Sequence, residues 1–182
     1  QRRPITTSLK RAQPGKPGTL ILLRHGGSTW NAGKLFTGWV DVDLSARGRR
    51  EMEHAAQLML ERGYKVDAVY TSVLKRAVTS TMVLLAELRQ TYRPVVKDWR
   101  LNERHYGALQ GLSKARLAKE LGGDKATRIR ASFDDRPPEM PADHTLSPLR
   151  ERKYDGVARE RIPLAESLRD CLERVRPLWH EN

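Results

Sequence analysis

The sequence predicts an α/β fold with a mostly parallel sheet. Short apolar segments alternate along the chain with longer stretches of helical periodicity, which is the pattern of helices laid over the faces of a sheet. The first apolar segment, residues 19–24 (TLILLR), is almost continuously apolar, as is typical of a parallel strand buried on both faces. Because 182 residues suffice for one hydrophobic core, we expect a single domain over residues 19–182.

A helix, a strand, a second helix and a third strand are expected to follow. Ser45 is a suitable N-cap for the first helix and Gly63 a suitable stop. Apolar residues recur between them at helical spacing: Met52, Ala55, Ala56 and Met59. Residues 66–71 (VDAVYT) predict the second strand and residues 94–97 the third. The helix between these strands has one face formed by Leu74, Ala77, Val78, Thr81, Leu85 and Leu88.

The remainder of the chain predicts helices separated by an irregular segment. Residues 113–134 indicate two short helices broken at Gly122 and Gly123. Residues 135–163 are rich in Pro, Asp and Arg and lack clear periodicity, so we expect them to run over the surface. A last helix is expected to pack on the core through one apolar face, formed by Leu168, Cys171, Leu172, Val175 and Trp179.

The charge distribution favours an anionic partner. The formal net charge is +12, and residues 1–20 hold five basic residues and no acid. Frequent Pro and Gly predict a flexible basic extension over residues 1–18, which lacks the apolar run of a secretory signal. We expect a cytoplasmic location, with organelle targeting by this extension as an alternative. The extension has no aromatic residue to stack on bases, which argues against nucleic acid. The sequence contains no apolar run long enough to predict a membrane span, and its single cysteine cannot form an intramolecular disulfide framework.

The predicted first strand ends in residues that could take part in catalysis, Arg24–His25–Gly26. Functional groups of open α/β sheets gather at the carboxyl ends of strands. A neutral imidazole can attack a phosphoryl group and hold it covalently, and an adjacent guanidinium can bind phosphate oxygens. Ser28 and Asn31 add neutral donors to this segment. His25 is therefore a candidate nucleophile, although a single histidine is more often structural.

Four segments in the same order support a resemblance to a known family. They are residues 20–31 (LILLRHGGSTWN), 36–45 (FTGWVDVDLS), 70–77 (YTSVLKRA) and 100–111 (RLNERHYGALQG). Together they resemble the cofactor-dependent phosphoglycerate mutases of the histidine phosphatase superfamily, from about Leu20 to Trp179. The resemblance implies a three-layer fold with a mostly parallel central sheet. It also implies transfer of a phosphoryl group between the 3- and 2-hydroxyls of glycerate.

The resemblance assigns roles to individual residues. His25 corresponds to the histidine that becomes phosphohistidine, and Glu103 to the proton donor and acceptor. Contact with substrate is implied for Arg24, Asn31, Thr37, Gly38, Arg76, Arg104, His105, Tyr106, Lys114 and Arg130. The resemblance further implies priming by 2,3-bisphosphoglycerate, no metal, small phosphorylated three-carbon substrates and assembly into a homo-dimer or tetramer.

Three departures from the family bear on activity. Gly27 stands where the family has glutamate directly after the Arg-His-Gly motif, so a carboxylate near the nucleophile is lost. Ala131 stands where the family has the second of two consecutive arginines. The family also carries a second histidine on a strand after the last helix, and the resemblance places that strand beyond Asn182. We therefore expect the fold to be incomplete on its C-terminal side.

The resemblance predicts phosphoglycerate mutase activity in glycolysis and gluconeogenesis. Bisphosphoglycerate synthesis or phosphatase activity is an alternative within the same family. A second alternative is a catalytically impaired relative that binds phosphorylated ligands or a partner protein, and Gly27 and Ala131 favour it. A longer mutase, of which this sequence is one part, would account for the missing strand.

Overall fold

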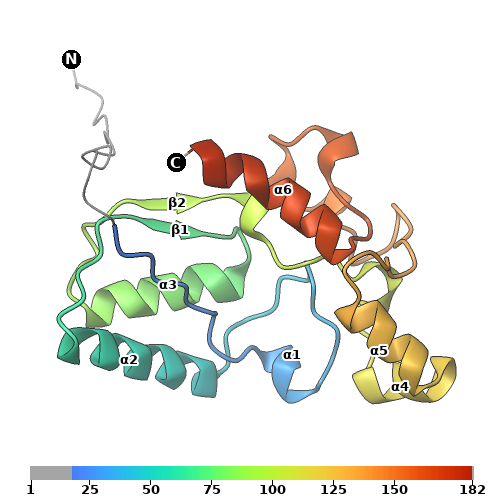
Figure 1. Ribbon diagram of the computed structural model, residues 1–182, viewed down its shortest axis with the longest axis horizontal. Helices are drawn as coiled ribbons and strands as arrows, with labels where there is room; N and C mark the ends of the chain where they lie inside the picture. The colour runs from blue at the N-terminus through green and yellow to red at the C-terminus, as the bar shows by residue number, and fades with distance from the viewer. Residues whose placement is uncertain (1–17, 182) are drawn as a thin grey trace.

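The computed structural model describes residues 18–181 and has an α/β architecture (Figure 1). Its sheet consists of two parallel strands, β1 (Val69–Thr71) and β2 (Val95–Lys97), with Val69 opposite Val95. In the view of Figure 1, two long helices lie on one side of the strands and the last helix lies on the other. The predicted α/β class with parallel pairing is confirmed. The predicted extension over residues 1–18 lies outside the described residues, except for Gly18.

Helices α2 (Ala46–Glu61) and α3 (Lys75–Glu87) pack against each other to form one part of the core. The Ser45 hydroxyl caps α2 by accepting a hydrogen bond from the Gly48 N–H at 3.0 Å, as predicted. The buried residues of this cluster are Met52, Ala56, Met59, Val83, Leu84 and Leu88. Removing these apolar faces from water holds the two helices together.

Residues 19–24 form no strand, so the prediction of a buried first strand is wrong for this structure. Their apolar side chains lie in solvent, and Leu22 is 84% exposed. A buried parallel strand needs hydrogen-bonded neighbours and helices on both faces. Within the described residues, β1 pairs with β2 alone, and no strand is hydrogen-bonded to residues 19–24. An apolar run is therefore not enough to make this segment a strand without hydrogen-bonded neighbours.

The middle of the chain holds short elements that carry site residues. Helix α1 (Thr29–Ala32) follows the His25 segment, and the single 3-10 turns η1 (Trp99–Leu101) and η2 (Gly107–Leu109) flank Glu103. Helices α4 (Lys114–Leu121) and α5 (Gly123–Ala131) are separated at Gly122, whose φ of +81° favours glycine, as predicted.

The irregular segment 135–163 is less superficial than predicted. It contains three 3-10 turns, η3 (Pro148–Arg150), η4 (Arg152–Tyr154) and η5 (Arg159–Arg161). Tyr154 is buried and its ring stacks on that of Trp39 at a centroid distance of 5.2 Å. Aromatic stacking and the hydrogen bond from Asn102 to the Tyr154 hydroxyl anchor this segment to the core.

Helix α6 (Leu168–Glu181) forms where the sequence predicts it, but the predicted apolar face is not the one that packs. Leu168, Leu172 and Trp179 are exposed, the last by 63%. Leu178 and the side chain of Arg174 are buried instead. The Arg174 side chain points inward because backbone carbonyls and the Glu166 carboxylate accept its hydrogen bonds there. No helix within residues 18–181 is both long and apolar enough to cross a membrane.

Candidate active site

His25 has the geometry of a neutral nucleophile. Its Nδ1 lies 2.7 Å from the Gly26 carbonyl oxygen, to which it donates a hydrogen bond. Its Nε2 therefore carries the lone pair, and it accepts a hydrogen bond from Arg76 Nε at 3.2 Å. Burial lowers the pKa of His25 below its ordinary value of 6.5, and the positive charge of Arg76 lowers it further. The imidazole is thus kept neutral, with Nε2 aimed at a cation.

Arg76 joins the parts of the site. Its side chain is only 1% exposed and enters from the first turn of α3. Besides His25, the guanidinium donates to the carbonyls of Gly38 (2.8 Å) and Val40 (3.1 Å). It also forms an ion pair of 2.9 Å with Glu103 Oε2. The candidate nucleophile and the candidate acid/base therefore both contact the Arg76 guanidinium.

Glu103 lies between η1 and η2, with its side chain 38% exposed. Its backbone carbonyl accepts a hydrogen bond from the Trp39 indole at 2.6 Å. The preceding residue, Asn102, is buried and accepts a hydrogen bond from the Val73 N–H through its side chain. The segment is thus fixed from both sides while the Glu103 carboxylate stays open to solvent, as proton exchange with a ligand requires.

Two residues that the sequence analysis missed, Ser80 and Gly48, hold the His25 loop. The Gly26 N–H donates to Ser80 Oγ at 3.1 Å, and Ser80 in turn donates to the Arg76 carbonyl. Gly26 also lies so close to Gly48 that a Cβ on either would overlap the backbone opposite. The helical spacing of Ser80 four residues after Arg76 was a signal for its role, whereas the contact of Gly26 with Gly48 had none.

A carboxylate from another element lies at the Gly27 position, where the family has glutamate. Glu51 of α2 accepts a hydrogen bond from the Gly27 N–H at 2.8 Å. That hydrogen bond, and a second one from Arg47, hold the pKa of Glu51 below its ordinary value. A carboxylate thus lies next to the His25 loop although residue 27 supplies none.

The polar residues after the loop are used in local structure. Ser28 caps α1 and forms a capping box with Asn31, whose side-chain oxygen accepts from the Ser28 N–H at 2.9 Å. Arg24 is exposed beside His25. The Thr37 hydroxyl is buried without a hydrogen-bond partner among the described residues. Gly38 adopts a φ of +53°, and a Cβ there would overlap the Gln110 side chain.

Two of the other predicted substrate residues, Arg104 and Lys114, lie at an aromatic pair, Phe36 and Tyr106, with ring centroids 5.2 Å apart. Arg104 lies over Tyr106 at 4.7 Å, and Lys114 over Phe36 at 5.9 Å. Arg104 donates to the carbonyls of Ile129 and Arg130, while its Nε and Nη1 are buried without partners among the described residues. The Arg130 side chain is exposed.

His105 does not present its side chain to a ligand in this structure. It is 0% exposed, its ring lies against Trp39, and its Nδ1 accepts a hydrogen bond from the Gly107 N–H. Burial lowers its pKa to about 3, so the ring is neutral. The His105 ring thus packs against Trp39 in this structure, and its contact with substrate stays a prediction. Within residues 18–181, no group of three or more His, Cys, Asp or Glu side chains is placed to hold a metal ion.

The structure thus brings together a histidine, a buried arginine and an open carboxylate on an α/β fold. The sequence matches the histidine phosphatase superfamily (branch 1) over residues 20–181, and the chain belongs to that superfamily. The resemblance found in the motifs is thus confirmed at the level of the superfamily.

Solved structures agree with this placement. Mycobacterial hydrolase 1 is 28% identical with a TM-score of 0.58, and the match covers 86% of this chain and 61% of that one. A mycobacterial glucosyl-3-phosphoglycerate phosphatase is 27% identical with a TM-score of 0.60, over 86% of this chain and 60% of that one. A putative α-ribazole-5'-P phosphatase from Escherichia coli shares the fold with a TM-score of 0.59 at 19% identity. That match covers 87% of this chain and 64% of that one. The chain thus spans about three fifths of the length of these structures.

Proposed function

We propose that the protein transfers phosphoryl groups through a phosphohistidine at His25, with Glu103 as the acid/base. The observation that carries this proposal is the arrangement of Arg76 between the two: 3.2 Å from His25 Nε2 and 2.9 Å from Glu103 Oε2. A guanidinium at that point neutralises charge on a phosphoryl group held beside the imidazole. Membership of the histidine phosphatase superfamily supports the same chemistry.

The proposed reaction has two steps. In the first, His25 Nε2 attacks phosphorus, the bond to the leaving oxygen breaks, and the Glu103 carboxyl gives that oxygen a proton. In the second, a hydroxyl group attacks the phosphohistidine, the carboxylate of Glu103 takes its proton, and the P–N bond breaks. His25 returns to its neutral form. The hydrogen bond from Nδ1 to the Gly26 carbonyl keeps Nε2 unprotonated before the first step.

For the substrate we propose a phosphorylated three-carbon acid, with the phosphate moved between the 3- and 2-hydroxyls. The four motif segments support this choice, and the cations around Phe36 could hold the carboxylate or second phosphate of such a molecule. Two buried nitrogens of Arg104 and the hydroxyl of Thr37 lack partners among the described residues, which fits an anionic ligand. 2,3-Bisphosphoglycerate would fit the same donors, and its chemistry is to supply the phosphoryl group that primes His25.

Hydrolysis is the second candidate, with water as the acceptor in the second step. It is favoured by the similarity to the mycobacterial glucosyl-3-phosphoglycerate phosphatase, at 27% identity. The two candidates share His25, Arg76 and Glu103 and differ only in the acceptor.

The test uses the full chain and radiolabelled 2,3-bisphosphoglycerate. We expect an acid-labile label on the folded protein that is absent from His25→Ala. Incubation with 3-phosphoglycerate then separates the candidates, because a mutase forms 2-phosphoglycerate and a phosphatase releases inorganic phosphate. A folded chain that takes no label from bisphosphoglycerate or from 3-phosphoglycerate would contradict the proposal.

A further inference from the structure

Arg174 of α6 holds the backbone that carries Glu103. Its guanidinium lies against the segment from η1 to Glu103 with its side chain only 6% exposed. It donates to the carbonyl of Arg100 at 2.7 Å, to that of Asn102 at 3.2 Å and to that of Glu103 at 3.3 Å. A fourth, longer contact reaches the Trp99 carbonyl at 3.4 Å. One side chain from a distant helix therefore fixes the five-residue stretch that ends in the candidate acid/base.

Trp39 completes this arrangement on the Glu103 carbonyl. The indole donates to that oxygen at 2.6 Å, and the Arg174 guanidinium lies over the Trp39 ring at 5.3 Å. Trp39 directly follows Gly38, whose carbonyl accepts from Arg76. Arg174 and Trp39 thus hold the backbone of Glu103, and Arg76 holds its carboxylate. Trp39 and the Gly38 carbonyl that Arg76 binds belong to the same loop.

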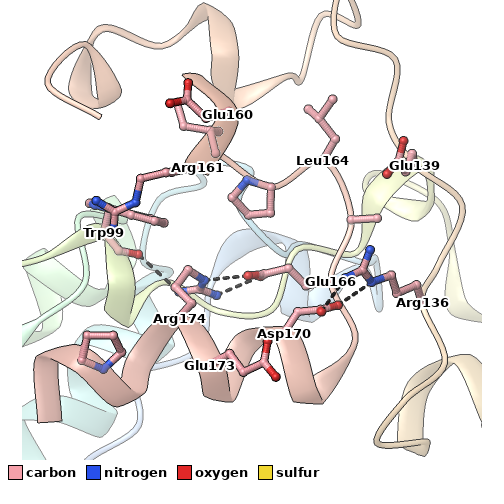
Figure 2. A pocket seen from close by; sticks show the side chains of 14 residues that line it. Trp99, Arg136, Glu139, Glu160, Arg161, Leu164, Glu166, Asp170, Glu173 and Arg174 are labelled. Carbon is pink, nitrogen blue, oxygen red and sulfur yellow. Dashed lines mark hydrogen bonds and ion pairs between the residues drawn. The ribbon is translucent and has the colours of Figure 1, made fainter. Parts of the chain in front are cut away.

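Glu166 supplies the counter-charge that fixes the direction of Arg174. Its two carboxylate oxygens lie 2.6 Å from Arg174 Nε and 2.8 Å from Nη2, a bidentate pair (Figure 2). The same carboxylate accepts a hydrogen bond from the His105 N–H at 2.8 Å. The segment is therefore held before, at and after Glu103 by one buried ion pair.

The outer side of this ion pair faces an open pocket of about 580 Å³ (Figure 2). Arg174, Glu166 and Trp99 line it, whereas His25, Arg76 and Glu103 do not. Arg136 and Asp170 form a second ion pair that lines the same pocket (Figure 2). Among the described residues, neither side chain is hydrogen-bonded to the segment from Trp99 to Glu103. That second pair joins Arg136 of the irregular segment to Asp170 of α6 and offers a control ion pair in the same pocket.

We infer that Arg174, oriented by Glu166, is a positioning residue for the proton transfer by Glu103. This inference rests on the proposed function. Its physical basis is that a general acid works only when its proton lies within hydrogen-bond reach of the leaving oxygen, so that a displacement of about 1 Å can lower the rate about 100-fold. A residue that merely stabilised the fold would affect all substrates alike.

The experiment compares Arg174→Lys with the unchanged full chain on two phosphate esters. One ester has an alkyl leaving group that needs a proton, and the other is p-nitrophenyl phosphate, whose leaving group departs as a stable anion. The readout is kcat/KM, which reports the steps up to phosphorylation of His25. We expect a loss of about 10- to 100-fold with the alkyl ester and little change with p-nitrophenyl phosphate. Arg136→Lys should leave both values near those of the unchanged chain.

Equal losses on the two esters, or no loss on the alkyl ester, would overturn the inference. If Arg174→Lys does not fold, Glu166→Gln takes its place, since the amide oxygen can still accept from His105 while the charge opposite Arg174 is lost. The same substrate dependence is expected, and its absence has the same meaning. If the unchanged chain turns over neither ester and forms no phosphohistidine, the proposed function is wrong, and the inference falls with it.

Discussion

Arg76 donates from Nε to His25 Nε2 at 3.2 Å, so the lone pair of the candidate nucleophile points at a buried cation. A cation there opposes protonation of the imidazole and favours a bound phosphoryl group at the same point. The same guanidinium neutralises Glu103. One side chain therefore adds to the effect of burial on the pKa of His25 and also fixes the place of Glu103.

The pH dependence of His25 phosphorylation follows from this contact. Burial, reinforced by Arg76, lowers the pKa of His25 below its ordinary value of 6.5, and only the neutral imidazole can attack phosphorus. We therefore expect the rate of labelling to decline as the pH falls, with a midpoint below 6.5. An NMR titration of the imidazole, run beside the labelling, checks the assignment. A decline centred at or above 6.5 would contradict it.

Arg76→Lys is expected to abolish labelling and to destabilise the fold. A single ammonium cannot reach His25, Glu103 and the carbonyls of Gly38 and Val40 together, and each buried group left unpaired costs about 1–3 kcal/mol. Urea unfolding measures the loss. Arg169→Lys serves as the control because its pair with Asp134 is exposed and should contribute at most about 1 kcal/mol. Equal stability of the two variants would contradict the role given to Arg76.

The two glycines after His25 are expected to respond differently to alanine. A Cβ at Gly26 would overlap the Gly48 backbone, which cannot move aside without unwinding the start of α2. At Gly27 the nearest atom would be Glu51 Oε2 at 3.4 Å, an ordinary contact. Gly26→Ala should therefore lose labelling, whereas Gly27→Ala should keep it, with a change in stability within about 0.5 kcal/mol. Labelling and urea unfolding of both variants check the pair, and a fully active Gly26→Ala would show that α2 can yield there.

Asp170 should contribute a pH-dependent part of the stability. Hydrogen bonds from Arg136, and then from Ser167, lower its pKa from 3.8 to about 2 in the folded protein. A lowered carboxyl pKa stabilises the fold fully above 3.8, and this contribution is lost as the pH falls through about 2. The destabilisation by Asp170→Asn should therefore be largest above pH 3.8 and shrink below it. Urea unfolding across this range measures the difference, and a difference independent of pH would contradict the assignment.

Elements whose signals are local could be predicted from the sequence alone. The Ser45 cap, the spacing of Met52, Ala56 and Met59, and the break at Gly122 depend on residues a few positions apart, and the structure has them as predicted. The motifs likewise identified His25, Arg76 and Glu103, which the structure brings together although up to 78 positions separate them. Residue chemistry and motif order were enough to name these three.

Which faces are buried and which groups support the site depends on contacts between distant segments of the chain. Residues 19–24 are apolar enough for a buried strand, yet no described strand pairs with them and their apolar side chains lie in solvent. On α6 the apolar stripe with Leu172 and Trp179 lies in solvent, while Arg174 is buried because the carbonyls around Glu103 and the carboxylate of Glu166 satisfy it. Such an arrangement has no signature along the chain, since a buried arginine is stable only where distant segments bring enough acceptors to one place.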